Sequence, residues 1–313
     1  MAESLLSDGI PTSSPAVEAN PEDLIPDTKV GTGLNILACP ICYRSFIDQN
    51  NSSLSITSPD GSCIECHGCK KAYLNNGIYL DLTITGGLKE YDQTLPFLTG
   101  FFRSSWISYL YERGWRQSFR WGGFPGLQRE IEMAKNYLRP AKGGTIVDAS
   151  CGSGLFSRQF AKSGMYSLVV ALDFSENMLQ HCNKFIKQEG ISKKNLILVR
   201  ADVSRLPFVS SSIDAVHAGA ALHCWSSPSA AVAEISRILR PGGVFVATTF
   251  IFDAIPIAVP VLRMLRKFYI GNSGKYMFLS EGELKDLCQA CGLVDVTCIR
   301  NRLFVMIAAT KPS

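Results

Sequence analysis

A turn over residues 147–154 carries the side chains best suited to hold a ligand. It reads Val-Asp-Ala-Ser-Cys-Gly-Ser-Gly, follows an apolar run and opens an amphipathic one. Glycines let a backbone approach a bound molecule closely, and the first turn of a helix presents free N–H groups. The Gly-x-Gly-x-x-Gly pattern of a dinucleotide site fails, because Ser157 holds the third glycine position. The residues expected to contact a cofactor here are Asp148, Ser150, Gly152 and Gly154.

Two more aspartates follow neighbouring predicted strands. Asp173 ends the second strand, where its oxygens can accept both hydroxyl protons of a ribose, and Asp202 follows the third, where it can accept from an adenine amino group. Asp148 ends the first strand, where the ammonium of a methionine moiety would lie. One aspartate at a strand end is usually a turn residue, but open α/β sheets bind ligands where several parallel strands end. An acidic rim suits the cationic sulfonium and ammonium of S-adenosylmethionine.

The elements that position these residues alternate along the chain. Short apolar runs at 145–147, 167–172, 196–200, 213–218 and 244–250 are separated by amphipathic segments. This alternation predicts a parallel sheet covered by helices on both faces. Ser175 and Ser280 are the expected N-caps of two helices, the second with a capping box to Glu283. Two last strands are expected to pair antiparallel across a turn at Arg300-Asn301.

The motif series resembles class I S-adenosylmethionine-dependent methyltransferases of type 11 over residues 140–310. The resemblance implies a doubly wound, mostly parallel α/β sheet of seven strands with a Rossmann-like arrangement, and S-adenosylmethionine as cofactor. Ser150 departs from the family, which usually has glycine there. The matching segments are 148–154, 171–173 (Ala-Leu-Asp), 200–202 (Arg-Ala-Asp), 206–208 (Leu-Pro-Phe) and 239–243 (Leu-Arg-Pro-Gly-Gly).

Two further segments are similar to plant plastid methyltransferases found with plastoglobules. These are residues 216–225 (Val-His-Ala-Gly-Ala-Ala-Leu-His-Cys-Trp) and 111–117 (Tyr-Glu-Arg-Gly-Trp-Arg-Gln). This resemblance reaches back to Cys39 and implies a chloroplast location with association to the plastoglobule surface. A more distant similarity is to bacterial ribosomal-RNA guanine methyltransferases, which also carry an N-terminal zinc site.

Four cysteines have the spacing of a structural zinc site. Cys39-Pro-Ile-Cys42 and Cys66-His-Gly-Cys69 are two Cys-x-x-Cys pairs, and four thiolates on two tight turns suit tetrahedral zinc. Cys63 also forms a Cys-x-x-Cys pair with Cys66, and His67 is an alternative ligand; the resemblance favours Cys66 with Cys69. Such a ribbon needs its metal to fold. It can also dock RNA or a partner, or brace the region over the active site.

His223 is the candidate catalytic residue on the acceptor side. It follows the fourth strand together with Trp225, where the transferred methyl group faces the acceptor in this fold. His223 would act as a general base if its pKa lies near neutral, and the equal alternative is a packed, hydrogen-bonded histidine. His217 lies inside the strand and is expected to be structural. Arg113, Trp115 and Arg116 belong to an aromatic, basic segment that either caps the pocket or packs in the core.

The chain divides into four predicted regions. Residues 1–35 read as a disordered tail, 36–85 as the zinc-ribbon-like subdomain, 86–140 as a helical, aromatic-rich cap or linker, and 141–313 as the cofactor-binding domain. No apolar run of eighteen residues is present, so no transmembrane segment is expected. The first 28 residues hold six acids and no Lys or Arg, which does not fit a transit peptide. We therefore keep the cytoplasm as an alternative to the chloroplast.

Three functions remain in competition. The first is transfer of a methyl group to a small, apolar or aromatic metabolite. The second is methylation of an RNA base, which the formal net charge of +4 neither demands nor excludes. The third is a non-catalytic, zinc-anchored scaffold, against which the intact turn and aspartates argue.

Overall fold

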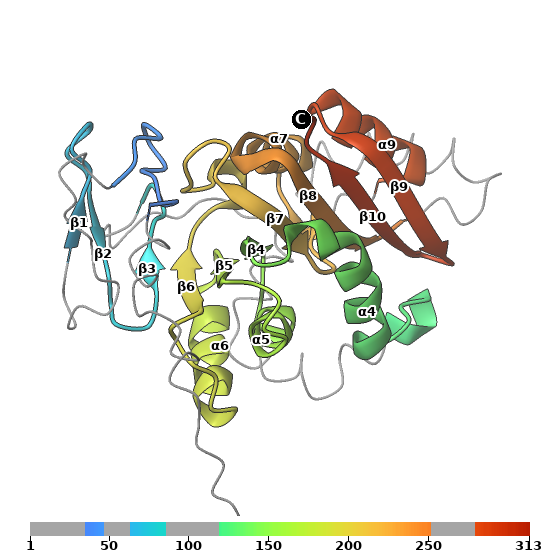
Figure 1. Cartoon of the computed structure of the whole chain (residues 1–313), viewed down its shortest axis with the longest axis horizontal. Helices are drawn as coiled ribbons and strands as arrows, with labels where there is room; N and C mark the ends of the chain where they lie inside the picture. The colour runs from blue at the N-terminus through green and yellow to red at the C-terminus, as the bar shows by residue number, and fades with distance from the viewer. Residues whose placement is uncertain (1–34, 47–62, 86–118, 252–278) are drawn as a thin grey trace, which may run out of the picture. The chain divides into compact units, whose positions relative to one another are not determined.

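The computed structural model describes residues 35–46, 63–85, 119–251 and 279–313 (Figure 1). The tail up to residue 34 and the aromatic segment with Arg113, Trp115 and Arg116 lie outside the described residues. Within the described residues, none of the helices has the length and apolar character needed to cross a membrane.

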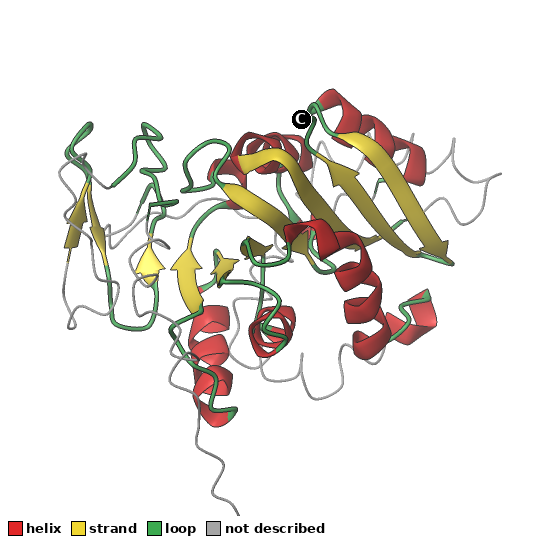
Figure 2. Ribbon diagram, in the orientation of Figure 1, coloured by secondary structure: helices red, strands yellow, loops and turns green. Residues whose placement is uncertain are grey.

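A mostly parallel sheet of eight strands forms the centre of the described residues (Figure 2). Its strands are β3 (Leu80–Asp81), β4 (Thr145–Ala149), β5 (Leu168–Asp173), β6 (Leu196–Arg200), β7 (Ile213–Ala218), β8 (Leu239–Phe250), β9 (Val294–Asn301) and β10 (Phe304–Thr310). Their order is β3-β6-β5-β4-β7-β8-β10-β9, with β9 and β10 antiparallel at one edge. The central strands are apolar at nearly every position, because helices bury both faces. The predicted doubly wound α/β fold is confirmed.

Helices cover both faces of this sheet (Figure 1). On one face α4 (Leu127–Leu138), α5 (Leu155–Lys162) and α6 (Glu176–Gln188) pack against alternate strand residues such as Ile146. On the other face α7 (Pro228–Ile238) and α9 (Glu281–Ala290) pack against the residues in between. The result is a three-layer arrangement whose two cores lie on opposite sides of the sheet.

The predicted helix starts are confirmed. The Ser175 side chain accepts a hydrogen bond from the backbone N–H of Met178 at the start of α6. At the start of α9, Ser280 and Glu283 form the reciprocal capping box. These short polar side chains satisfy N–H groups that have no partner within the helix.

The hairpin at the carboxyl end is antiparallel as predicted, but the predicted turn was two residues too early. Asn301 still pairs with Phe304, so Arg302 and Leu303 form the turn. Arg302 adopts a left-handed φ of 56°, and the N–H of Leu303 donates to the carbonyl oxygen of Gly122 at 3.0 Å. The turn thus contacts a distant segment of the chain, and the local sequence does not indicate this contact.

The cysteine-rich segment contributes to the main sheet as well as forming its own hairpin. Strands β1 (Cys63–Glu65) and β2 (Ala72–Leu74) pair antiparallel, while β3 pairs in parallel with β6. Apolar residues of this segment, including Leu37, Phe46 and Tyr73, belong to the same buried cluster as α7 and α9. The sheet therefore has one strand more than the seven that the resemblance implied, and the extra strand comes from the region assigned to the ribbon.

Candidate active site

The glycine turn between β4 and α5 has the backbone conformation that its sequence requires. Gly152 and Gly154 have positive φ angles of 57° and 80°. A β-carbon at Gly154 would lie 2.2 Å from Sγ of Cys182 on α6. Glycine is therefore needed there both for its conformation and for the close approach of α5 and α6.

Asp173 holds this turn from the neighbouring strand. Its Oδ2 accepts the N–H of Gly152 at 2.8 Å, and its Oδ1 accepts the N–H of Ser175 at 2.8 Å. Burial of the carboxyl group raises its pKa, and the two N–H donors partly offset that rise. The carboxylate thus lies between the glycine turn and the first turn of α6, at the carboxyl end of β5.

Asp202 lies on the same edge of the sheet, one strand further. It begins the short 3-10 helix η5 (Val203–Arg205), and its Oδ1 accepts the N–H of Ser204 at 2.8 Å. The N–H of Ala201 bonds to the carbonyl oxygen of Asp173 at 3.2 Å, which joins the two strand ends. The structure thus brings Asp173, Asp202 and the glycine turn to one edge, as predicted from the strand alternation.

Asp148 lies beneath this edge. Only 2% of it is exposed, and its Oδ1 accepts from Nδ1 of His217 at 2.8 Å while its Oδ2 accepts from the Ser157 hydroxyl. Phe156 and Phe160 pack against the His217 ring, whose Nε2 is buried and has no hydrogen-bond partner among the described residues. Both oxygens of Asp148 thus accept hydrogen bonds from groups of the core, at the carboxyl end of β4.

His223 lies in the 3-10 helix η6 (Leu222–Cys224), directly after β7. It is 8% exposed, and its Nδ1 hydrogen-bonds Oγ1 of Thr249 on β8 at 3.0 Å. Burial lowers the pKa of His223 from 6.5 to about 4. The imidazole is therefore neutral at pH 7.

Aromatic rings surround this side of the site. Phe250, at the end of β8, packs edge-on against His223, with ring centroids 5.3 Å apart. It also contacts Phe119 and Phe124 at centroid distances of 5.1 and 4.5 Å, and Phe124 in turn contacts Phe304. The surroundings of His223 are thus apolar and aromatic.

Comparison with known proteins agrees with this geometry. Residues 147–247 match the methyltransferase domain family. A protein of Arabidopsis thaliana named as an uncharacterized chloroplastic methyltransferase is 56% identical over 282 residues, which cover 89% of this chain and 79% of the relative. The chain belongs to the S-adenosylmethionine-dependent methyltransferases. A second Arabidopsis protein with the same kind of name is 48% identical, over 88% of this methyltransferase and 78% of the relative.

A solved structure shows the same fold. The YcgJ protein from Bacillus subtilis superposes on 60% of the methyltransferase and on all of its own chain, with a TM-score of 0.51 and 14% identity.

The methyltransferase brings four cysteine sulfurs together at its amino-terminal side. The Sγ atoms of Cys39, Cys42, Cys66 and Cys69 all lie within 4.8 Å of one another, with two pairs at 3.5 Å. Tetrahedral zinc with Zn–S bonds of about 2.3 Å places its sulfurs about 3.8 Å apart, so these four residues fit the metal. Cys63 lies outside this group and is exposed, at the start of strand β1.

The cysteine segment contacts the loop that carries Asp202. Arg205 donates from Nε to the carbonyl oxygen of Pro40 and from Nη2 to that of Ile41, at 2.7 Å for the second bond. Both carbonyls lie between Cys39 and Cys42. The N–H of Ala38 also bonds to the carbonyl oxygen of Pro207 at 2.9 Å. The segment with Cys39 and Cys42 is therefore attached to the loop that follows Asp202.

Two hydrogen-bond networks at the site were not predicted from the sequence. Glu130 on α4 is fully buried and accepts from the hydroxyl of Thr248, which accepts the N–H of Ala220 at the end of β7. The Trp225 indole N–H donates to Oγ of Ser150 in the cofactor turn. The departure from glycine at position 150 was the only available sign of the second network.

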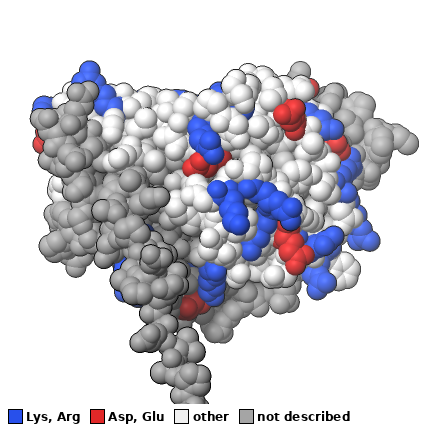
Figure 3. Space-filling model, viewed as in Figure 1, with Lys and Arg blue, Asp and Glu red and all other residues white. Residues whose placement is uncertain are grey.

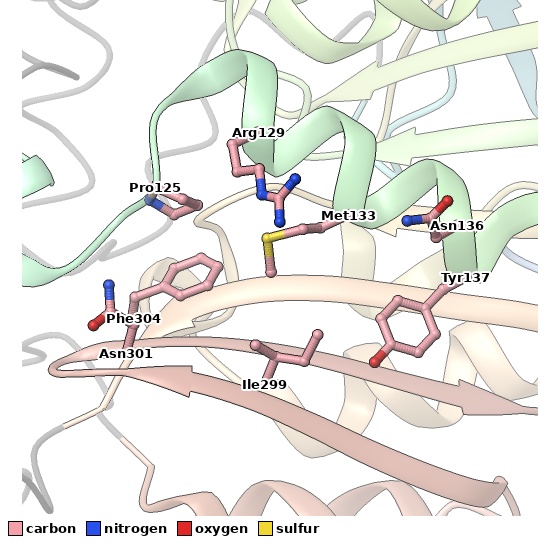
Figure 4. A pocket seen from close by; sticks show the side chains of 8 residues that line it. All are labelled: Pro125, Arg129, Met133, Asn136, Tyr137, Ile299, Asn301 and Phe304. Carbon is pink, nitrogen blue, oxygen red and sulfur yellow. The ribbon is translucent and has the colours of Figure 1, made fainter.

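A hollow of about 470 Å³ lies between α4 and the β9–β10 hairpin (Figure 4). Met133, Ile299 and Phe304 line it with apolar side chains, and Arg129 extends from α4 beside Met133. It lies at the β9–β10 edge of the sheet and none of its lining residues belongs to the glycine turn, so it is distinct from the candidate cofactor site.

Proposed function

We propose that this methyltransferase transfers a methyl group to a small, apolar or aromatic metabolite. One observation supports the proposal: the glycine turn, Asp173 and Asp202 lie together at one edge of the sheet, on which His223 and the aromatic ring packed against it also lie. S-adenosylmethionine, when bound, supplies an electrophilic methyl group on a sulfonium. The chain's own task is to align the acceptor with that group and to exclude water.

Each cofactor residue has a role that its geometry supports. The backbone of Ser150, Gly152 and Gly154 would lie against the methionine part of the cofactor. Asp173 would exchange its bond with the Gly152 N–H for bonds from the ribose hydroxyls, and Asp202 would accept from the adenine amino group. Asp148 would support the cofactor turn from below, because its oxygens already accept hydrogen bonds from Ser157 and His217 at the end of β4.

His223 would orient the acceptor rather than deprotonate it. An imidazole whose pKa lies at about 4 is a weak base at neutral pH, and proton transfer to it is correspondingly inefficient. A neutral ring can still accept a hydrogen bond from an acceptor hydroxyl or phenol. Phe250, Phe119 and Phe124 would pack against the apolar body of that molecule.

RNA-base methylation is the second candidate, supported by the cysteine cluster and by its distant similarity to ribosomal-RNA enzymes. Specific RNA recognition uses a basic surface that neutralises phosphates. On the face seen in Figure 3, Lys and Arg side chains gather near the centre, with Asp and Glu side chains directly beside them. On this face, the adjacent acids favour the small-molecule reading.

The four cysteines are proposed to bind a structural zinc ion that braces the Asp202 loop through Arg205. Zinc analysis of the purified protein should give about one ion per chain, following the four-ligand stoichiometry of such sites. The double variant Cys39→Ser, Cys42→Ser should lose the ion; a variant at Cys63, outside the cluster, should keep it. Full retention by the double variant would contradict the assignment.

The names of the two Arabidopsis relatives support a chloroplast location for this chain. Association with the plastoglobule surface is a further proposal that rests on the family resemblance. Co-fractionation of the full-length protein with floated plastoglobules would support it, and recovery only in the stroma would contradict it.

The substrate class is tested by transfer of label from S-adenosylmethionine carrying a radioactive methyl group to a plastid extract. Label that enters an organic phase and resists ribonuclease supports the small-molecule proposal. Label that precipitates with nucleic acid and is released by ribonuclease contradicts it. The Gly154→Ala variant, whose new β-carbon meets Cys182, serves as the inactive control.

A further inference from the structure

Trp225 contacts the cofactor turn directly, although it lies 75 residues further along the chain. Its Nε1–H donates to Oγ of Ser150 at 2.9 Å, and only 6% of the residue is exposed. A buried indole N–H needs an acceptor, and within the described residues this hydroxyl is one that it reaches. The bond joins the end of β4 to the segment that follows β7.

The residue that accepts this bond has an unusual backbone conformation. Its φ of 59° lies in the left-handed region, which a residue with a β-carbon seldom adopts. Glycine would adopt the same conformation without strain. Here a serine occupies the position, and its side chain is held by a donor from another loop.

We propose that Trp225 is a positioning residue for cofactor binding: its indole N–H holds Ser150 so that the turn keeps the shape that receives the methionine part of the cofactor. The inference rests on the proposed cofactor site. Trp225 lies two residues after His223, so the same bond fixes the cofactor turn and the acceptor-side segment η6 relative to each other. Ser150, held by Trp225, thus takes the conformation that a glycine would adopt at this position.

The test is a double-mutant cycle read by binding of S-adenosylhomocysteine in calorimetry. Trp225→Phe keeps an apolar ring and removes the donor. A hydrogen bond of ordinary strength predicts a dissociation constant about three- to tenfold higher. When Ser150 is first replaced by glycine, the turn no longer depends on the bond, so adding Trp225→Phe should change the dissociation constant by less than about twofold.

A second pair of variants avoids any change in the core. Ser150→Ala removes the acceptor but keeps the β-carbon, whereas Ser150→Gly removes both. Ser150→Ala should therefore bind more weakly than Ser150→Gly. In proton–nitrogen NMR spectra without ligand, Ser150→Ala should also shift the Trp225 Nε1–H resonance and speed its exchange with solvent, which a purely packing role would not do.

The outcomes separate clearly. Equal weakening by Trp225→Phe in the wild-type and Ser150→Gly backgrounds would overturn the proposal, because it would show a packing effect alone. Wild-type affinity in Trp225→Phe would overturn it too. If the wild-type protein itself failed to bind S-adenosylhomocysteine, the proposed cofactor site would fall first. Trp121→Phe, the same change on a ring that is 86% exposed, is the matched control and should leave affinity unchanged.

Discussion

Burial of His223 predicts a stability that falls as the pH drops below neutral. In the folded protein the imidazole takes up its proton only near pH 4, whereas in the unfolded chain it does so near pH 6.5. Between these values the unfolded state binds more protons, so acid favours unfolding. The stabilisation is complete above pH 6.5 and is lost progressively as the pH falls towards 4.

The size of the effect follows from the shift. A difference of 2.5 in pKa corresponds to about 3 kcal/mol in the limit of low pH, and about 2 kcal/mol of this is lost between pH 7.5 and pH 5. Other groups titrate over the same range, so the quantity to measure is a difference. The free energy of unfolding in urea is determined for the wild type and for His223→Gln at both pH values. The advantage of the wild type should shrink by about 2 kcal/mol at pH 5.

A variant without a titrating group provides the control. Ile251→Val removes one methylene from a fully buried residue near the end of β8 and should cost about 1 kcal/mol at both pH values. If the difference between wild type and His223→Gln were the same at pH 7.5 and pH 5, His223 would titrate alike in both states. That result would refute its burial as a neutral ring.

Three further changes test other parts of the site. Gly154→Ala adds a β-carbon that clashes with Cys182, at a backbone φ of 80°. The variant should lower the free energy of unfolding by about 2–4 kcal/mol and abolish binding of S-adenosylhomocysteine. A stable variant that binds normally would contradict the close approach of α5 and α6. Ser157→Ala leaves an oxygen of Asp148 buried without its donor and should cost about 1–3 kcal/mol in urea unfolding, whereas an unchanged midpoint would argue against that contact. Arg205→Ala removes the hydrogen bonds to two carbonyl oxygens in the cysteine segment. Chelators should therefore extract zinc from this variant several-fold faster than from the wild type. Equal rates would contradict the proposed bracing role of Arg205.

The parallel centre of the sheet was predictable because the local sequence of each strand indicates a strand. A short apolar run such as 196–200 lies between amphipathic segments, and only a strand buried on both faces suits it. Once the strands are parallel, their carboxyl ends share an edge, so the proximity of Asp173 and Asp202 to the turn follows. Serine caps are equally local, since each satisfies N–H groups within three residues.

Features that depend on distant segments were not predictable in the same way. β3 is two residues long and joins the sheet through β6, where the Arg200 guanidinium also bonds Asp81 at 2.9 Å. Nothing in a two-residue strand indicates its partner. The engagement of both Asp148 oxygens depends likewise on His217, 69 positions away.

The central claim is that the glycine turn and Asp173 form the cofactor site, and calorimetric titration with S-adenosylhomocysteine tests it most directly. Asp173→Ala should weaken binding by about ten- to a hundredfold, as expected for lost hydrogen bonds to a charged group. Asp286→Ala removes the same charge from the exposed surface of α9 and should bind as the wild type does. Equal affinity of Asp173→Ala and the wild type would contradict the assignment of the site.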